Sequence, residues 1–271
     1  MSAGFNVVIP ARYPSTRLPG KPLADIGGSP MIVRVVRQAL AAGAARVIVA
    51  TDDARVVDAV EAAGCEARLT RTDHASGSDR VMEVVDAEGW ADDALVLNVQ
   101  GDEPLLPARV IAALADAMHQ RPDLSVGTMS EQLSDPRLLF DPNVVKVVCA
   151  ADGRALYFSR APIPYARDAF VAGQVSEIPG ELHAPASLPA EVLWTRHIGL
   201  YAYRVRALRQ FVKWPIGLLE RAESLEQLRL LEHGVPLLVV PTPLPVPGGV
   251  DTPADLERVR AIVAGMSMDA G

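Results

Sequence analysis

Residues 5–23 read FNVVIPARYPSTRLPGKPL, a short apolar run that passes directly into a loop rich in proline and basic side chains. The run from Phe5 to Ile9 has the length and composition of a buried strand. An amphipathic segment from Met31 to Ala42 follows, with Pro30 in its first turn, and predicts a helix. This stretch therefore predicts the opening strand, loop and helix of an α/β protein.

The same alternation continues through the first half of the chain. It predicts strands at Arg46–Ala50, Cys65–Leu69 and Ala94–Val99, and helices at Asp53–Ala63, Ser78–Glu88 and Ala108–Met118, with Ser76 or Ser78 as the cap of the second helix. Such a rhythm is typical of a mostly parallel central sheet with helices on both faces. Ligands bind such sheets at the carboxyl ends of the strands, so we expect the informative residues just after each strand.

The second half has a different pattern. It predicts strands at Val144–Ala150, Ala155–Ser159, His197–Tyr203 and Val235–Val240, one strong helix at Leu218–Gly234, and a closing helix at Thr252–Val263. Between them, Arg160–Val192 is rich in proline, glycine and alanine, which predicts a long loop or lid.

Composition narrows the function classes. The chain has 271 residues, of which 49% are hydrophobic and 22% charged, so it suits one large α/β domain or two small ones. Its net charge of -7 disfavours nucleic-acid binding, and an anionic substrate would need a local cluster of cations. The two cysteines, Cys65 and Cys149, have no metal-binding spacing and suit a reducing cytoplasm. The N-terminus does not read as a signal peptide, and prolines interrupt the longest uncharged segment, which argues against a membrane helix.

The loop from Ala11 to Leu23 carries three cations, Arg12, Arg17 and Lys21, and no acidic residue. Gly20 lets the backbone approach a ligand closely, and the prolines stiffen the loop. A solvated basic loop is the plainer alternative, but this combination after the first strand favours phosphate binding. The loop lacks the P-loop pattern, and no glycine fingerprint of a nicotinamide oxidoreductase occurs in the chain.

Two aspartates are candidate ligands of a magnesium ion. Asp102 follows a predicted buried strand at the ligand-binding end, where carboxylates commonly hold a metal that bridges phosphates, and Gly101 permits a tight approach. A turn with an Asx hydrogen bond would explain Asp102 equally well. Asp251 precedes the last predicted helix, and either it or Thr252 could simply cap that helix, with Pro253 in the first turn.

A third segment, Thr70–Arg80, is dense in hydrogen-bonding side chains around Gly77. It is suited to reading the edge of a base. His74 has the alternative of satisfying a loop carbonyl.

Together these segments resemble the 3-deoxy-manno-octulosonate cytidylyltransferases, also called CMP-Kdo synthetases. The similarity runs in one register along nearly the whole chain, through Ala11–Leu23, Arg71–Arg80, Asn98–Pro104, Phe140–Lys146, Ala155–Arg160, Arg196–Arg204, Leu225–Arg229 and Gly249–Pro253.

The resemblance implies a fold and a reaction. The fold is a Rossmann-like nucleotidyltransferase domain over residues 1–271, with a smaller sugar-binding and dimerisation subdomain at about 130–215. The anomeric hydroxyl of Kdo attacks the α-phosphate of CTP, magnesium pyrophosphate leaves, and CMP-Kdo serves lipopolysaccharide assembly in Gram-negative bacteria. The family is cytoplasmic and usually homodimeric, with CTP and Kdo as small-molecule substrates and neither nucleic acid nor membrane as a partner.

The resemblance also implies residue roles. Arg12, Arg17 and Lys21 match the loop that binds the CTP phosphates; Arg71, Ser76 and Gly77 match the loop that reads cytosine; Asp102 and Asp251 match the Mg²⁺ ligands; Gln100, Arg160, His197, Tyr201, Glu226 and Gln227 match the sugar-acid pocket. Of these, Lys21, Arg12, Asp102 and Asp251 are the expected catalytic group. An arginine suits the pocket because Kdo carries a carboxylate, which arginine binds bidentately.

Some of the residues matched to the sugar-acid pocket could instead have purely structural roles. Tyr201 and Tyr203 alternate on a strand, so one of them is expected in the core. Glu226 and Gln227 could lie on a surface face of their predicted helix, and His197 could be structural. The segment from about 172 to 192 is longer than in short family members and reads as a surface excursion near the lid or dimer edge. The sequence indicates no general base, and a sialic acid in place of Kdo, a non-catalytic nucleotide-binding module and a dinucleotide oxidoreductase are the rival functions.

Overall fold

The computed structural model describes residues 4–171 and 187–268, which fall into two units. The first combines Met1–Pro122, Leu200–Lys213 and Pro243–Gly271, and the second combines Asp123–Gly199 and Trp214–Thr242. The subdomain expected at about 130–215 remains a prediction.

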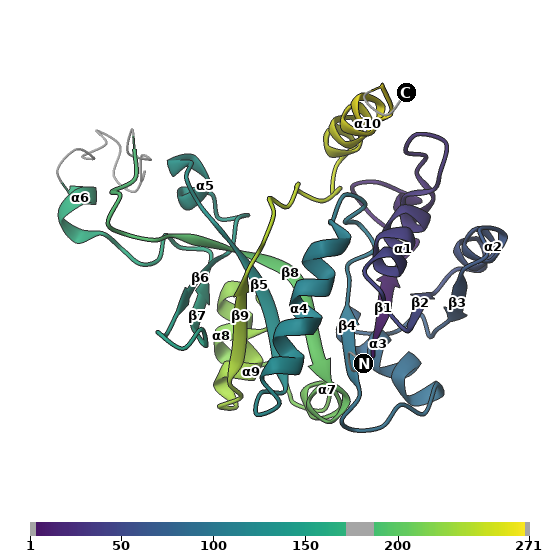
Figure 1. The fold of residues 1–271 in the computed structure, drawn as a ribbon, viewed down its shortest axis with the longest axis horizontal. Helices are drawn as coiled ribbons and strands as arrows, with labels where there is room; N and C mark the ends of the chain where they lie inside the picture. The colour runs from purple at the N-terminus through teal and green to yellow at the C-terminus, as the bar shows by residue number, and fades with distance from the viewer. Residues whose placement is uncertain (1–3, 172–186, 269–271) are drawn as a thin grey trace. The chain divides into compact units, whose positions relative to one another are not determined.

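The first unit is built on parallel strands. Their order is β3 (Glu66–Leu69), β2 (Arg46–Thr51), β1 (Phe5–Ala11) and β4 (Leu95–Asn98), and the second half of β8 (Thr195–Arg204) pairs antiparallel with β4. Figure 1 shows β1 between β2 and β4, and the register places Val8 opposite both Ile48 and Asn98. Val7, Val8 and Ile9 are fully buried, as expected for a central strand with both faces covered.

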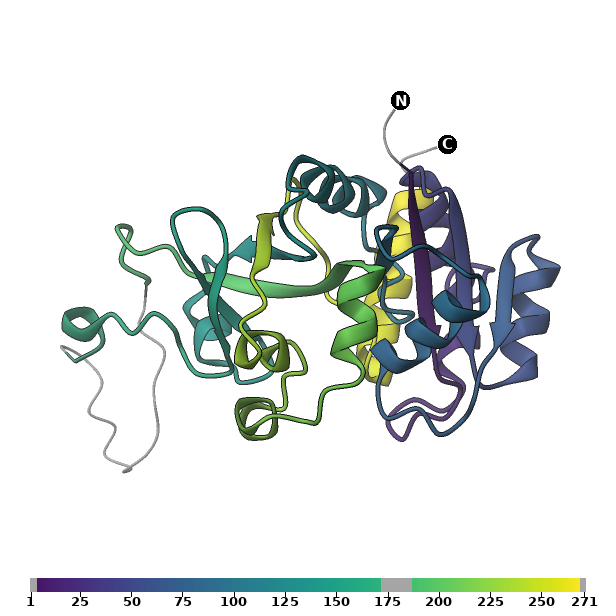
Figure 2. The same ribbon diagram turned by 90° about the horizontal axis from the view of Figure 1, so that it is seen from below.

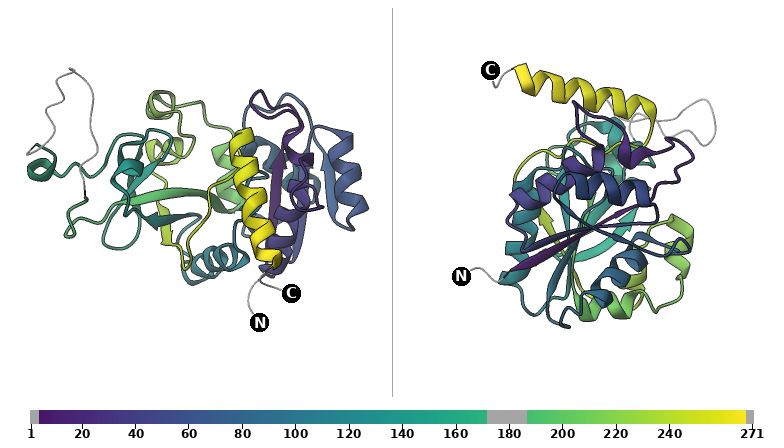
Figure 3. Two further views of the ribbon diagram at one scale, coloured as in Figure 1. Left: turned by 90° about the horizontal axis from the view of Figure 1, so that it is seen from above. Right: turned by 90° about the vertical axis from the view of Figure 1, so that its right-hand side faces the viewer.

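Helices cover this sheet. They are α1 (Met31–Ala41), α2 (Ala54–Ala62), α3 (Gly77–Ala87), α4 (Ala108–Gln120), α7 (Val205–Phe211) and α10 (Pro253–Met268), with a 3₁₀ turn, η1 (Lys21–Leu23), in the loop after β1. α1 buries an apolar stripe at helical spacing that includes Met31, Val35 and Ala39. α2 lies beside β3 (Figure 2). α10, in yellow, lies against the segment that leads into α1 (Figure 3), where Val259 packs with Ile26 and Met31.

The second unit pairs β5 (Val126–Gln132) in parallel with β9 (Leu237–Pro241), and β6 (Lys146–Cys149) antiparallel with β7 (Ala155–Ser159) and with the first half of β8. Its helices are α5 (Pro136–Phe140), α6 (Arg167–Val171), α8 (Leu218–Glu223) and α9 (Leu228–Glu232). A separate apolar cluster joins Leu133, Leu139, Phe170 and Trp194. The mixed α/β architecture with a mostly parallel central sheet is confirmed.

The single helix predicted at Leu218–Gly234 is wrong. α8 ends at Glu223, Ser224 adopts a left-handed conformation with φ of 52°, and α9 begins only at Leu228. The break has a tertiary cause, because Arg160 donates hydrogen bonds to the carbonyls of Glu223 and Ser224, at 2.6 and 3.3 Å. Those carbonyls would otherwise accept bonds within a continuous helix.

Other expectations were incomplete. β5, α5 and α7 were not predicted, and part of the expected Arg160–Val192 loop is helical as α6. Most of the excursion expected near 172–192 lies outside the described residues. Within the described ranges, no helix combines the length and apolar character that crossing a bilayer requires.

Candidate active site

A cavity of about 410 Å³ in the first unit lies where β1 and β4 end. Pro10 and Ala11 from the end of β1 line it, as do residues of the loops that follow both strands. The fold thus brings together seven predicted site residues, which are Arg12, Arg17, Lys21, Gly77, Gln100, Asp102 and Asp251. This agrees with the rule that ligands of parallel sheets bind at the carboxyl ends of the strands.

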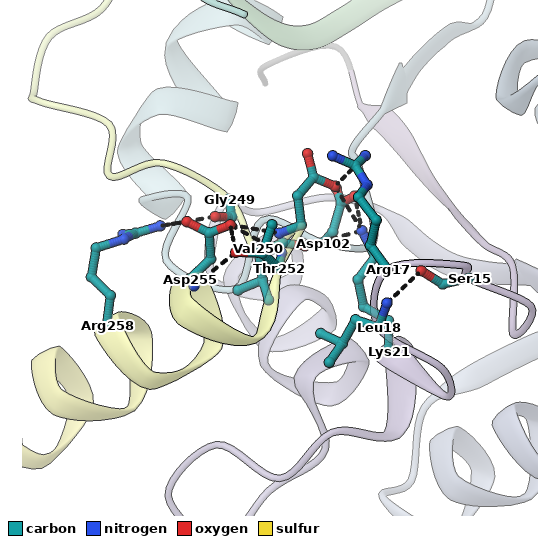
Figure 4. Close-up of polar contacts among 11 residues, drawn as sticks. Ser15, Arg17, Leu18, Lys21, Asp102, Gly249, Val250, Thr252, Asp255 and Arg258 are labelled. Carbon is teal, nitrogen blue, oxygen red and sulfur yellow. Dashed lines mark hydrogen bonds and ion pairs between the residues drawn. The ribbon is translucent and has the colours of Figure 1, made fainter.

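Lys21 lies between the two predicted metal ligands. Its Nζ donates to Asp102 Oδ2 at 2.7 Å, to Asp251 Oδ1 at 3.1 Å and to the carbonyl of Val250 at 3.0 Å. The Lys21 side chain is only 15% exposed. Burial favours the neutral amine, but the two carboxylates outweigh it and raise the pKa of Lys21 above its ordinary value. Figure 4 shows Lys21 and Asp102 facing each other, with Arg17 beside them.

Backbone contacts hold the two aspartates together. The Val250 amide donates to the carbonyl of Asp102 at 2.9 Å, which fixes the two loops side by side. A Cβ on Gly101 would lie 2.9 Å from the Pro10 carbonyl oxygen, so only glycine fits there. The close approach at Gly101 is thus to the end of β1, and the predicted approach of a ligand stays a prediction.

The capping alternatives for the last helix are settled in favour of Thr252. Its Oγ1 accepts from the Asp255 amide at 3.2 Å, and Asp255 Oδ2 accepts from the Thr252 amide at 3.0 Å, which is a reciprocal capping pair. Asp251 is thereby left to face Lys21.

The two arginines of the loop are held differently. Arg12 donates through Nη2 to the carbonyl of His74. Arg17 is 65% exposed, with its Nη2 3.5 Å from Asp251 Oδ1. The loop carries no acidic residue in sequence, but the fold adds two carboxylates to its three cations. Because the cations outnumber the carboxylates, the cluster keeps a small excess of positive charge, which favours an anionic ligand.

The donor set fits a magnesium ion held jointly with a phosphate. One oxygen each of Asp102 and Asp251 lies within hydrogen-bond distance of a single nitrogen, so one small cation could contact both. Mg²⁺ in proteins commonly takes one or two carboxylates and completes its shell with substrate phosphates and water. Across residues 4–171 and 187–268, no cluster of three or more potential metal-binding side chains occurs.

The predicted base-reading residues lie around the start of α3. Ser76, one of the two predicted caps, caps this helix in a reciprocal pair with Asp79, and Gly77 lines the cavity. Arg71 does not line this cavity; it lines a different hollow with Asp73 and is largely exposed. The His74 ring contacts Glu83, so the expected contact of its side chain with a loop carbonyl is wrong; instead its own carbonyl accepts from Arg12.

The predicted sugar-acid residues are divided between the units. Gln100 and Tyr201 belong to the first unit, and Arg160, His197, Glu226 and Gln227 belong to the second. The Arg160 side chain donates three hydrogen bonds to backbone carbonyls, those of Glu223, Ser224 and Pro142, the last at 2.8 Å. In this arrangement its guanidinium braces the backbone of the second unit.

Tyr201 and Tyr203 are both buried and stack on each other, with ring centroids 5.8 Å apart. Glu226 and Gln227 lie between α8 and α9 rather than on a helical face. Gln227 is buried, which rules out the surface alternative for it, and its Nε2 has no hydrogen-bond acceptor among the described residues.

His197 is half-buried in the second unit, edge-on to Phe158. Its Nε2 lies 2.9 Å from Thr128 Oγ1, and that hydroxyl donates its hydrogen to the Ile198 carbonyl at 3.2 Å. Nε2 therefore carries the proton and donates to Thr128. Desolvation lowers the pKa of His197 to about 3, so the ring is neutral at physiological pH.

This gives a testable pH dependence. Between pH 6.5 and about 3 the unfolded chain binds a proton at His197 that the folded chain does not, so acidification removes stability. From pH 7 to pH 5, the wild type is expected to lose about 1–2 kcal/mol more unfolding free energy than His197→Gln. Urea denaturation at both pH values measures this, and equal losses in the two proteins would contradict it.

Two charged side chains next to this cavity, Asp52 and Arg80, lie in segments that the sequence marks as informative, but no role was predicted for either. Asp52 directly follows β2, and Arg80 lines the cavity from α3 although it is fully buried. The position after a strand was a usable signal for Asp52, but an arginine inside an amphipathic helix gives no sign that it faces inward.

Comparisons with known proteins identify the family of the chain. A family model described as "Cytidylyltransferase" matches residues 6–237. Two curated relatives, from Methylococcus capsulatus and Pseudomonas syringae pv. syringae, are named 3-deoxy-manno-octulosonate cytidylyltransferase. Each is 50% identical over 265 residues, with 98% of this chain and 99% or 100% of the relative covered. The chain belongs to the 3-deoxy-manno-octulosonate cytidylyltransferase family.

Two solved structures match the fold of this chain. A structure described as CMP:2-keto-3-deoxy-manno-octonic acid synthetase complexed with CTP matches with a TM-score of 0.85 and 42% identity, covering 97% of this chain and 100% of that one. A nucleotidyl transferase from Methanothermobacter matches with a TM-score of 0.56 and 16% identity, which shows a common fold alone.

Proposed function

We propose that this chain transfers the cytidylyl group of CTP to the anomeric hydroxyl of Kdo, giving CMP-Kdo and pyrophosphate. The observation that carries the proposal is Lys21 placed between Asp102 and Asp251, in one cavity with Arg12 and Arg17. The family and the CTP-complexed structural relative support the choice of nucleotide, and the names of the relatives support the choice of sugar.

The reaction forms one bond and breaks one. The anomeric oxygen bonds to the α-phosphorus, the bond from that phosphorus to the bridging oxygen of the β-phosphate breaks, and the hydroxyl proton is released. Negative charge grows on the departing pyrophosphate, where Arg12, Arg17 and Lys21 would neutralise it. Mg²⁺, when bound, lowers the charge on the phosphate oxygens, and Asp102 and Asp251 are the side chains that would hold it.

The remaining proposals follow from the family resemblance. Arg71, Ser76 and Gly77 would recognise cytosine, and Gln100, Arg160, His197, Tyr201, Glu226 and Gln227 would contact the sugar acid. We also propose that the protein is a cytoplasmic homodimer whose product serves lipopolysaccharide assembly.

The first experiment is pyrophosphate release from CTP and Mg²⁺ with and without Kdo. We expect release that depends on Kdo and does not occur with ATP, GTP or UTP. CTP binding in calorimetry without release, across a panel of acidic sugars, would instead indicate a nucleotide-binding module. Faster release with a sialic acid than with Kdo would replace the proposed sugar and keep the reaction class.

A further inference from the structure

A buried ion pair contacts the cationic loop of the first unit, the Ala11–Leu23 segment that carries Arg12, Arg17 and Lys21. Arg80 Nη2 donates to Asp52 Oδ2 at 3.1 Å, and the two side chains are 0% and 6% exposed. Asp52 comes directly after β2, and Arg80 lies on α3. A fully buried guanidinium is costly unless it is paired, and burial lowers the pKa of Arg80 while the Asp52 carboxylate opposes this.

The pair connects the loops at the carboxyl ends of three neighbouring strands. Asp52 Oδ1 accepts from the Tyr13 amide at 3.1 Å, in the loop after β1. Arg80 Nη1 donates to Thr70 Oγ1, after β3, and that hydroxyl donates to the Thr51 carbonyl at the end of β2, at 2.9 Å. One ion pair therefore fixes the spacing of the loops that surround the cavity.

The position of Tyr13 makes this relevant to phosphate binding. Tyr13 directly follows Arg12, and its amide donates to the Asp52 carboxylate. Above it, the Arg55 guanidinium lies 3.7 Å from the centre of the Tyr13 ring, which adds a second restraint on the same residue. Arg12 itself is tied to the His74 carbonyl, so both ends of this short segment are anchored.

Stability alone is a weak reason for such a pair. Buried ion pairs can often be replaced by apolar residues at little cost, whereas their geometry fixes one arrangement of the groups around them. Arg80 also lines the cavity, and its Nε has no hydrogen-bond acceptor within the described part of the chain.

We propose that Asp52 and Arg80 are positioning residues that hold the Arg12–Lys21 loop in the shape that receives the triphosphate of CTP. This inference rests on the proposed function of that loop. The pair acts through the two loops that it joins, the loop after β1 and the loop after β3. Its loss should therefore weaken binding of the polyphosphate more than binding of the nucleoside monophosphate.

The test compares Asp52→Asn with the wild type. Asparagine keeps the shape and an oxygen acceptor for the Tyr13 amide but leaves Arg80 without a counter-charge. We expect the Kd for CTP and for pyrophosphate, measured by calorimetry, to rise about 10-fold or more. The Kd for CMP should change less than about threefold, since CMP lacks the two phosphates that the loop is proposed to bind.

The matched control is Glu220→Gln in the second unit. Glu220 and Arg229 form a second buried pair, with contacts of 2.6 and 2.7 Å and side chains about nine-tenths buried. This variant should lose stability to a similar degree while its Kd for CTP and pyrophosphate stays that of the wild type. If Asp52→Asn changes those constants no more than Glu220→Gln, or changes the CMP constant equally, the positioning role is overturned.

Two further variants keep the test decisive. Thr70→Val removes one acceptor of Arg80 but no charge, so it should fold and show a smaller rise in the same two constants; no rise would also overturn the proposal. Arg80→Lys keeps the charge and should lie between the wild type and Asp52→Asn. Should the wild type bind CTP and pyrophosphate yet release no pyrophosphate with any sugar acid, the proposed function fails while this comparison of affinities still stands.

Discussion

Replacing Asp102 by asparagine is expected to lower kcat by at least about 100-fold while leaving the fold intact. Asparagine has nearly the same shape, so the turn after β4 and the contact of its backbone with Val250 should survive. The lost negative charge removes one of two carboxylates that would hold Mg²⁺ against the phosphates. That interaction matters most as charge develops on pyrophosphate, so the effect should appear in kcat as well as in kcat/KM.

The measurement is pyrophosphate release at saturating CTP and Kdo, with circular dichroism and Tm as checks on folding. The matched control is Asp25→Asn, which removes an aspartate whose Oδ1 accepts from the Gly28 amide at 3.3 Å and which does not line the cavity. We expect the control to keep kcat within about threefold of the wild type. If Asp102→Asn behaves like Asp25→Asn, then Asp102 is only a turn residue, as its local sequence also allows.

The site could be predicted from sequence as far as its geometry follows from topology. The carboxyl ends of parallel strands meet at one edge of a sheet, so the loops after β1 and β4 had to come together. In the structure, Val8 of β1 pairs with Ile48 of β2 and with Asn98 of β4, so these strands end at the same edge. The sequence also offered Thr252 as one of two caps of the last helix, because a capping pair depends on residues only three positions apart.

What sequence could not supply depends on contacts between distant residues. The break between α8 and α9 arises from Arg160, far away in the chain, which draws the carbonyls of Glu223 and Ser224 out of a helix that local propensity favours. Arg160 itself was expected to bind a carboxylate because of its side-chain chemistry. Which acceptors a guanidinium finds is a property of the folded chain, and here three of them are backbone carbonyls.

The same limit applies to the cationic loop. Its sequence shows only positive charge, but the fold sets Asp102 and Asp251 around Lys21. Without a divalent ion the Lys21 ammonium is therefore the cation that both carboxylates share, while Arg17 lies 3.5 Å from Asp251 alone. A positive charge that stands between two metal-binding carboxylates competes with the metal for them.

Lys21→Met is therefore expected to have opposite effects on metal binding and on catalysis. Methionine has a similar length and no charge, so the two carboxylates lose their internal counter-ion and should bind Mn²⁺ to the free protein several-fold more tightly. Turnover should nevertheless fall by about 100- to 1,000-fold, since Lys21 is one of the cations proposed to stabilise the departing pyrophosphate. Electron paramagnetic resonance of free Mn²⁺ measures the first effect in the absence of nucleotide, and pyrophosphate release measures the second.

Two controls separate these effects. Lys21→Arg keeps the charge and should leave Mn²⁺ affinity near that of the wild type. Arg12→Met removes a charge from the same cavity that contacts the His74 carbonyl rather than the carboxylate pair, so it should slow turnover with a smaller gain in Mn²⁺ affinity. Unchanged Mn²⁺ affinity in Lys21→Met would mean that Asp102 and Asp251 do not form a metal site, because removing a cation within 3.1 Å of both carboxylates must alter any divalent site that they share.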